Sequence, residues 1–210
     1  MRASRAALIV AISALVATAC GTSEPTQTTP GVVGGSGLVL SADGIGTYAI
    51  GDDADVVIDG VSAQIGGWDS DSLEPGTAIE VPECGGGDVR QMSWGNLVLV
   101  FVDTGAGSRL FTWAYGYDPL TGNPEDRRGL DLRTASGVAL GTSRSELERI
   151  HRGEVSITDD MSVDIARFTI DGDEEEHLGG RFGSTAPDAV VQFLERIPGC
   201  DLSLIHISEP

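Results

Sequence analysis

The spacing of apolar residues along the chain changes twice from helical to extended. The first helical segment follows Asp52 and Asp53, either of which can cap a helix that runs to about Gln64. Its apolar residues at helical spacing are Val56, Val57 and Val61. The pair Gly66-Gly67 predicts the end of this helix.

A second helix is predicted from Arg144 to about His151. Ser143 and Glu146 have the spacing of a capping box. In this motif the side chain of each residue binds the backbone amide of the other at the start of the helix. Gly153 predicts the end of this helix. Each helical segment therefore begins at a cap and stops at glycine.

Downstream of the first helix, the pattern is extended. The runs Met92 to Val102 and Arg109 to Tyr115 are rich in β-branched and aromatic residues. The Gly-rich segment 103–108 lies between them and favours a turn. The two runs together predict a hairpin.

Strands are also predicted downstream of the second helix. Asp164 to Ile170 and Ala189 to Leu194 have strand-like composition, and the acidic loop 171–176 follows the first of them. A helix over 187–196 is the alternative for the last segment, because Pro187 suits a first helical turn. We favour the strand.

A weak self-similarity organises the domain. A strand-like start, a glycine, an apolar residue, an apolar-Gly pair and a helix cap occur in that order over Leu40–Val57, and the order returns over Leu132–Leu147. Hairpins rather than crossovers follow each copy, which predicts an α+β fold: a tandem duplication of a short helical segment followed by antiparallel strands. The first repeat spans 38–116, a polar linker 117–130 and the second repeat 131–201.

The apolar-Gly-x-Ser entry to the second helix, Leu140-Gly-Thr-Ser143, resembles the repeats of beta-lactamase inhibitory protein and of the small outer-membrane-assembly lipoproteins. The tandem layout suits the former. The duplicated pattern with a terminal Gly-Cys also resembles uncharacterised actinobacterial-type lipoproteins. The resemblance spans about Leu40 to Cys200 and implies binding rather than catalysis, and no inhibitory residue can be carried over by position.

The N-terminus has the layout of a signal for export. Arg2 and Arg5 precede the uncharged apolar run 6–16, and Ala17 and Ala19 provide a small-residue cleavage site. The apolar run is too short to cross a bilayer comfortably, and no other stretch is long or apolar enough. We therefore expect residues 1–19 to be a signal peptide.

The segment Val16–Cys20 resembles a bacterial lipobox, in which the cysteine thiol is diacylated, although Ala17 stands where Leu is usual. This resemblance implies lipidation at Cys20 and a flexible Pro/Gly/Ser/Thr-rich tether over 20–37. The expected location is the extracytoplasmic face of the cell membrane, with the membrane bound through the lipid anchor. A secreted, unlipidated protein is the alternative, because Ala17 and Ala19 also satisfy an ordinary signal.

The charge of the chain narrows the class of partner. It has 13 basic residues, all of them Arg, against 32 acidic ones, for a net charge of -19. Nucleic acids and anionic lipid headgroups need a basic footprint, so we exclude nucleic acid as a partner. The partners that remain compatible with this charge are an envelope protein and a glycan.

Two cysteines remain once Cys20 is assigned to lipid. Cys84 and Cys200 each lie in a Pro/Gly turn, and paired cysteines are common outside the cytoplasm, so a Cys84–Cys200 disulfide is predicted. A zinc site is disfavoured, because only His151 and His177 could join the thiols and neither has zinc-ligand spacing.

A search for catalytic motifs is negative, and we expect no enzyme activity and no cofactor. A Gly-x-Ser-x-Gly elbow, a phosphate loop and a His-Glu-x-x-His motif are absent from the sequence. His151 and His177 are available as bases, but an isolated histidine in a polar stretch is usually a surface residue. The acidic side chains are too numerous and scattered to single out, and they include Asp52, Asp53, Asp55, Asp69, Asp71, Asp159, Asp160 and Asp173.

Two groups of residues offer chemistry for binding, but each also has a simpler structural role. Asp69 with Asp71 and the acidic loop 171–176 offer oxygen ligands for calcium, but neither fits an EF-hand. The aromatic residues favour core packing over an exposed platform, and they are Trp68, Trp94, Trp113, Tyr115 and Tyr117.

The segment Leu202–Pro210 matches, codon by codon, the translation of a transposase adapter used in sequencing libraries. We therefore assign no functional weight to it or to His206. For the remaining domain the sequence favours a non-enzymatic binding or envelope-scaffold module, and an extracytoplasmic hydrolase or a protein inhibitor is the alternative.

Overall fold

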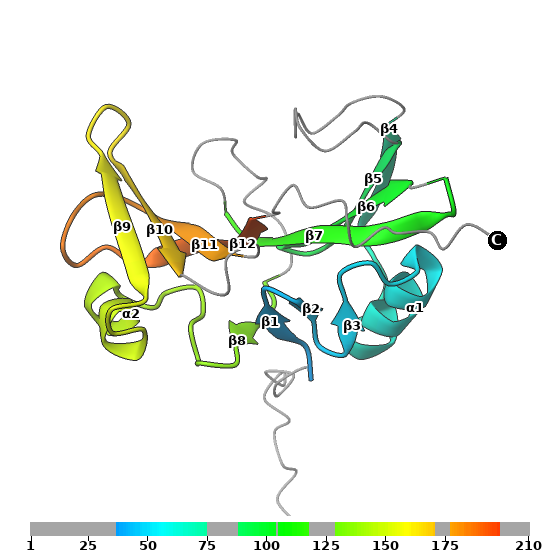
Figure 1. Ribbon diagram of the computed structural model, residues 1–210, viewed down its shortest axis with the longest axis horizontal. Coiled ribbons are helices and arrows are strands. Elements are labelled where there is room, and N and C mark those ends of the chain that lie inside the picture. Colours follow the sequence, from blue (N-terminus) through cyan, green and yellow to red (C-terminus); the bar gives the residue numbers. More distant parts are fainter. Residues whose placement is uncertain (1–36, 75–87, 104, 118–128, 171–176, 198–210) are drawn as a thin grey trace, which may run out of the picture. The chain divides into compact units, whose positions relative to one another are not determined.

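The computed structural model describes residues 37–74, 88–103, 105–117, 129–170 and 177–197 (Figure 1). All of them lie in one compact unit of the chain, Val33–Pro210. The described part of the chain is mostly β-sheet with two short helices, which agrees with a mixed α+β class.

The described residues of the first half of the domain form eight elements. They are β1 (Val39–Ser41), β2 (Gly44–Ile45), β3 (Tyr48–Ala49), α1 (Ala54–Ile65), β4 (Ser70–Glu74), β5 (Val89–Trp94), β6 (Leu97–Asp103) and β7 (Ser108–Gly116). The second half contributes β8 (Arg133–Thr134), α2 (Arg144–Ile150), β9 (Val155–Asp160), β10 (Ile165–Ile170), β11 (His177–Phe182) and β12 (Val191–Ile197).

Eight strands form one antiparallel sheet in the order β4-β5-β6-β7-β12-β11-β10-β9. Within β4–β7 and within β9–β12, strands consecutive in sequence are neighbours. The two groups join at the pairing of β7 with β12, where Ala114 faces Glu195 and Tyr115 faces Leu194. The other four strands form a small sheet in the order β3-β2-β1-β8, in which β1 and β8 run parallel. Both sheets therefore contain strands from both halves.

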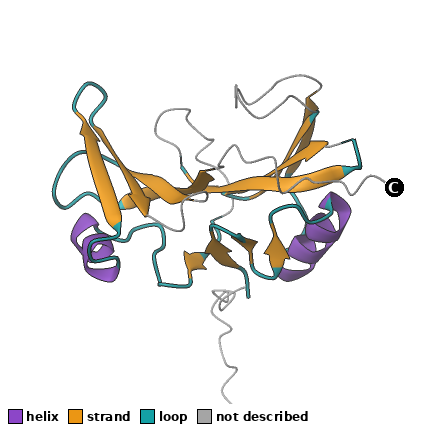
Figure 2. Ribbon diagram, viewed as in Figure 1, coloured by secondary structure: helices purple, strands orange, loops and turns teal. Residues whose placement is uncertain are grey.

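The helices and the small sheet lie on the same side of the eight-stranded sheet (Figure 2). One cluster of buried side chains fills the space between them and includes Val57 of α1, Leu147 of α2 and Leu40 of β1. The largest side chains in this cluster are Trp94, Trp113, Tyr115, Phe101, Phe168 and Phe182. A single core thus spans both halves.

The predicted helices are confirmed. Asp53 caps α1, and its carboxylate accepts a hydrogen bond of 3.1 Å from the Asp55 amide, while Gly66 with φ 92° ends the helix. Ser143 caps α2, and its hydroxyl oxygen accepts a bond of 3.3 Å from the Glu146 amide. The predicted end of the second helix near His151 is confirmed, because α2 ends at Ile150 with His151 as its C-cap, whereas Gly153 lies in the turn that follows and does not cap the helix.

Two backbone hydrogen bonds join the turn before each helix to the last strand of the same half. The Gly51 amide donates to the Leu110 carbonyl over 2.8 Å, and the Leu110 amide donates back to the Asp52 carbonyl over 2.9 Å. In the second half, the Gly141 amide donates to the Val191 carbonyl over 2.8 Å, and the Val191 amide donates back to the Thr142 carbonyl over 2.9 Å. The start of each helix is fixed to the sheet by these bonds.

The strand predictions needed three corrections. The single strand expected from Met92 to Val102 is wrong, because Gly95, with φ 58°, and Asn96 turn the chain between β5 and β6. The strand favoured over 189–194 is confirmed but runs from Val191 to Ile197. Strands β4, β9 and β11 lie in segments for which no strand was predicted.

Candidate functional site

The residues singled out for lipidation and for the disulfide lie outside the described residues. They are Cys20, Cys84 and Cys200. Lipidation and the Cys84–Cys200 bridge therefore stay predictions.

The aromatic residues divide into two groups. Trp94, Trp113 and Tyr115 are buried in the core, as expected, with at most 2% of their surface exposed. The core role predicted for Trp68 and Tyr117 is wrong, because these side chains are exposed by 51% and 40%.

The aspartates considered for calcium bind protein groups instead. Asp69 accepts a short hydrogen bond from the Gly95 amide. Asp71 is bidentate to Arg90, with Nε–Oδ1 and Nη2–Oδ2 distances of 3.0 and 2.9 Å. The hydrogen bonds from Arg90 lower the pKa of Asp71 from its usual value. Within the described ranges, no three His, Cys, Asp or Glu side chains gather so as to hold a metal ion.

On the side of the sheet away from the helices, Arg181 of β11 lies beside two residues of β12. Its guanidinium is 5.0 Å from the centre of the Phe193 ring, and its Nη2 is 3.5 Å from the Glu195 carboxylate. Phe193 is buried but does not belong to the main core cluster. The strand alternation accounts for this, because the neighbouring Leu194 points into the core.

The tip of the β9–β10 hairpin carries the most exposed apolar group of the described residues. Met161 is 77% exposed and Val163 is 49% exposed. In the sequence, Ser162 separates the two apolar residues, and Asp160 and Asp164 flank them on either side. Isolated exposed apolar residues are common, but two on one tight turn form a small apolar patch.

Hydrogen bonds hold this tip in one conformation. Asp160 Oδ1 accepts from the Ser162 amide at 3.0 Å and from its hydroxyl at 2.6 Å. Asp164 Oδ1 accepts from the Thr185 amide at 3.1 Å and from its hydroxyl at 2.6 Å. These bonds lower the pKa of both aspartates. The tip is therefore preorganised, and both flanking carboxylates are charged near neutral pH.

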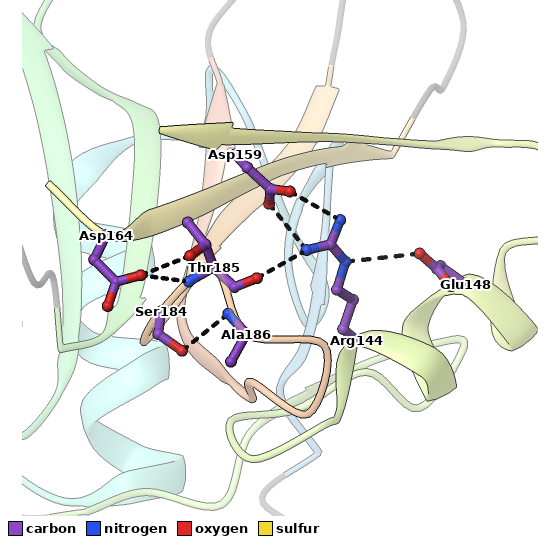
Figure 3. A network of polar contacts seen from close by, with 7 residues as sticks. All are labelled: Arg144, Glu148, Asp159, Asp164, Ser184, Thr185 and Ala186. Atoms are coloured by element: carbon purple, nitrogen blue, oxygen red, sulfur yellow. Dashed lines mark hydrogen bonds and ion pairs between the residues drawn. The ribbon is translucent and has the colours of Figure 1, made fainter. Parts of the chain in front are cut away.

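Figure 3 shows the polar network that supports this hairpin close to its tip, where Asp159 pairs with Ala166 next to the turn. Arg144, the first residue of α2, donates to Asp159 of β9 at 2.9 Å and to the carbonyl oxygen of Thr185 at 3.5 Å. Its Nε lies 3.8 Å from the Glu148 carboxylate on the same helix. One guanidinium thus joins α2, the edge strand β9 and the loop that binds Asp164.

A serine, a histidine and a glutamate come together near the C-terminal end of α2. The Oγ atom of Ser136 lies 2.9 Å from Nε2 of His151, and Nδ1 of His151 lies 3.8 Å from the Glu154 carboxylate. Thr134 Oγ1 is 2.9 Å from the Ser136 Oγ atom. A hydroxyl, a base and an acid in this order are the groups of an activated nucleophile.

Sequence reasoning missed this cluster. His151 was expected at the surface, but only 13% of its side chain is exposed. Ser136 was not singled out, because it stands 15 residues before His151 and has no motif around it. The turn Thr134–Gly137 and the end of α2 bring the two side chains together, and neither spacing nor composition signals that contact.

No protein-family model matches the chain, and no significant match was found among curated proteins or solved structures. None of the helices in the described ranges combines the length and the apolar character needed to cross a bilayer.

Proposed function

We propose that the chain is a lipid-anchored binding module on the extracytoplasmic face of the cell membrane, and that it contacts an envelope protein through the β9–β10 hairpin tip. The observation that carries the proposal is the exposed Met161–Val163 pair on a turn fixed by hydrogen bonds. The N-terminal lipobox resemblance and the Pro/Gly-rich tether support the anchoring.

We further propose that the domain is a tandem duplication. The turns before the helices support this, because residues 49–53 correspond to residues 139–143 bond by bond. The Asp52 amide donates to the Ala49 carbonyl at 3.1 Å, and the Thr142 amide donates to the Ala139 carbonyl at the same distance. The side chains of Asp52 and Thr142 bind the Ala49 and Ala139 amides in return, at 2.8 and 3.0 Å.

The register at the centre of the sheet is consistent with the same correspondence. The helix-entry turns contact Leu110 in β7 and Val191 in β12, so these residues are equivalent. Counting on from each by four residues gives Ala114 and Glu195, which face each other in the β7–β12 pair. A twofold relation between the halves requires equivalent residues to meet at its axis, and these two do.

A protein is the partner favoured by the chemistry of the tip. An apolar pair fixed in advance loses little conformational entropy on binding, which favours insertion into an apolar pocket. The carboxylates of Asp160 and Asp164 beside it favour a pocket with a basic rim and disfavour an anionic bilayer surface. A glycan would instead be expected to stack on exposed aromatic rings.

The anchor is tested by metabolic labelling with a clickable fatty acid. We expect label in the native protein and none in the Cys20→Ser variant, because the thiol is the acylation site. Equal labelling of both proteins, or labelling of neither, contradicts the anchor.

The binding surface is tested by replacing single residues with photoreactive benzoylphenylalanine in intact cells. Position 161 is compared with position 56, because Val56 is also well exposed, at 59%, but lies on α1. We expect a discrete adduct with one envelope protein from position 161 only.

Two further variants decide whether that adduct reports the proposed contact. Val163→Asp should abolish the adduct from position 161, and Trp68→Ala, which alters an exposed side chain outside the hairpin, should leave it unchanged. Adducts of equal yield from positions 56 and 161, or an adduct that survives Val163→Asp, would show that the hairpin tip is not the binding surface.

A further inference from the structure

The cluster of Ser136, His151 and Glu154 has the geometry of a hydroxyl activated by a base. At 2.9 Å, Ser136 Oγ is within hydrogen-bond distance of His151 Nε2, and the residue containing it is exposed. A nucleophile must reach both its base and its substrate, and Ser136 meets both conditions.

The surroundings favour the tautomer that this chemistry needs. The Glu154 carboxylate lies 3.8 Å from Nδ1 of His151, and its negative charge favours a proton on that nitrogen. The other ring nitrogen, Nε2, is then free to accept the proton of Ser136. Thr134 Oγ1 contacts the same serine oxygen from 2.9 Å and accepts a hydrogen bond of 3.0 Å from the Val138 amide, which fixes the Thr134 side chain.

We propose that Ser136 is a covalent acyl-accepting site, with His151 as its general base and Glu154 as a positioning residue for the imidazole. Ser136 Oγ attacks the carbonyl carbon of an ester, and its proton moves to His151 Nε2. The C–O bond to the leaving alcohol then breaks, the electron pair stays on the leaving oxygen, and that oxygen takes the proton from His151. The products are an acyl-Ser136 ester and the free alcohol. This activity is separate from the proposed binding role of the hairpin tip.

The backbone around Ser136 sets the class of substrate. Fast acyl transfer needs amides that bind the developing oxyanion, and loss of one such donor costs about a hundredfold to a thousandfold in rate. The Gly137 amide already donates to the Thr134 carbonyl at 2.9 Å, and the Val138 amide donates to Thr134 Oγ1. Neither is available to an oxyanion. The site therefore suits activated esters of small acyl groups and slow, stoichiometric acylation rather than rapid turnover.

The test is acetylation of the purified full-length chain by p-nitrophenyl acetate, followed by released p-nitrophenolate and by peptide mapping. The chain has no Lys, so lysine amines do not compete for the acetyl group. Ser162 is the internal control, because it is exposed and its hydroxyl donates to Asp160 at 2.6 Å without a histidine. We expect acetylation at Ser136 to be at least tenfold faster than at Ser162.

Three variants separate activation from simple exposure. General-base catalysis contributes roughly a hundredfold or more, so His151→Gln should slow acetylation of Ser136 by about that factor and leave Ser162 unchanged. Glu154→Gln should slow it severalfold and Glu154→Asp should restore most of the rate. Glu154 is largely exposed, at 67%, so these two variants test the site even if His151→Gln weakens the fold.

Several outcomes overturn the proposal. Equal acetylation of Ser136 and Ser162 would show that the serine is not activated. An unchanged Ser136 rate in folded His151→Gln, or in Glu154→Gln, would remove the assigned base or its positioning residue. Undiminished p-nitrophenolate release by Ser136→Ala would show that a group other than Ser136, such as His151 or a cysteine thiol, reacts with the ester.

Discussion

Arg196 of β12 donates a hydrogen bond of 2.7 Å from Nε to the carbonyl oxygen of Ala42, 154 residues earlier in the chain. Its Nη1 donates to the Phe111 carbonyl at 3.2 Å, and only 5% of the residue is exposed. A buried guanidinium therefore connects the last described strand to the turn after the first one.

Replacing Arg196 by Leu should lower the free energy of unfolding by about 1 to 3 kcal/mol, because two partly buried carbonyl oxygens lose a charged donor. The stability of Arg196→Lys should lie between those of the native protein and Arg196→Leu, since an ammonium cannot reproduce the fork of donors. The control is Arg149→Leu on α2, where the side chain is 62% exposed and a change within about 0.5 kcal/mol is expected. Urea denaturation measures all three, and equal losses for Arg196→Leu and Arg149→Leu would contradict the structural role.

Gly180 in β11 is required for close packing. A Cβ atom at this position would lie 2.1 Å from the Phe193 carbonyl oxygen and 2.6 Å from the ring of Phe168. Gly180→Ala should destabilise the domain by at least about 2 kcal/mol. Gly67→Ala is the matched control, because no atom lies within 4 Å of its Cβ position. Thermal unfolding should separate the two variants by many degrees, and the same melting temperature for both would refute the packing argument.

The raised pKa of Tyr115 predicts that the domain loses stability at alkaline pH. Burial raises the pKa of its hydroxyl, which donates to the Leu130 carbonyl and accepts from the Leu132 amide at 3.2 Å. Because the pKa is raised in the folded state, this contribution is complete below the unfolded value of about 10 and is lost as the pH rises through the folded value.

The Tyr115→Phe variant should therefore be less stable than the native protein at neutral pH and should lose less stability on going to alkaline pH. Unfolding midpoints measured from about pH 8 to pH 11 bracket the usual tyrosine pKa. Parallel curves for the two proteins would show that Tyr115 does not carry the alkaline dependence.

The predicted Cys84–Cys200 bridge should appear as one linked peptide pair in a non-reducing digest. In the chain-entropy model, a bridge over so long a loop stabilises the fold by roughly 4 to 5 kcal/mol, so a reductant should shift the urea midpoint downward. Alkylation of both thiols in the unreduced protein would refute the bridge.

Local signals made the helices predictable from the sequence. The Asp53 cap, the Ser143–Glu146 spacing and the glycine after α1 act within a few residues, so a linear sequence contains them. The hairpin of β6 and β7 was also predictable, because its strands are long and apolar.

The missed elements depend on tertiary contacts. Strand β11 contains two adjacent glycines, which disfavour a strand locally, but the ring of Phe168 and the Phe193 backbone leave no room for a side chain at Gly180. Strand β9 is short and acidic, and it is stabilised by six facing residues of β10 and by Arg144 from α2. The Ser136–His151 contact is of the same kind, because it exists only once the turn and the helix have formed.

The central position of β12 has a consequence for biogenesis. This strand is the last element of the described chain, yet it lies between β7 and β11 in the middle of the eight-stranded sheet. A nascent or truncated chain that stops before Val191 leaves β7 and β11 with open hydrogen-bonding edges, which are templates for aggregation. The eight-stranded sheet therefore cannot be completed until residues 191–197 are available, and a protease that removes this segment would open the sheet at its centre.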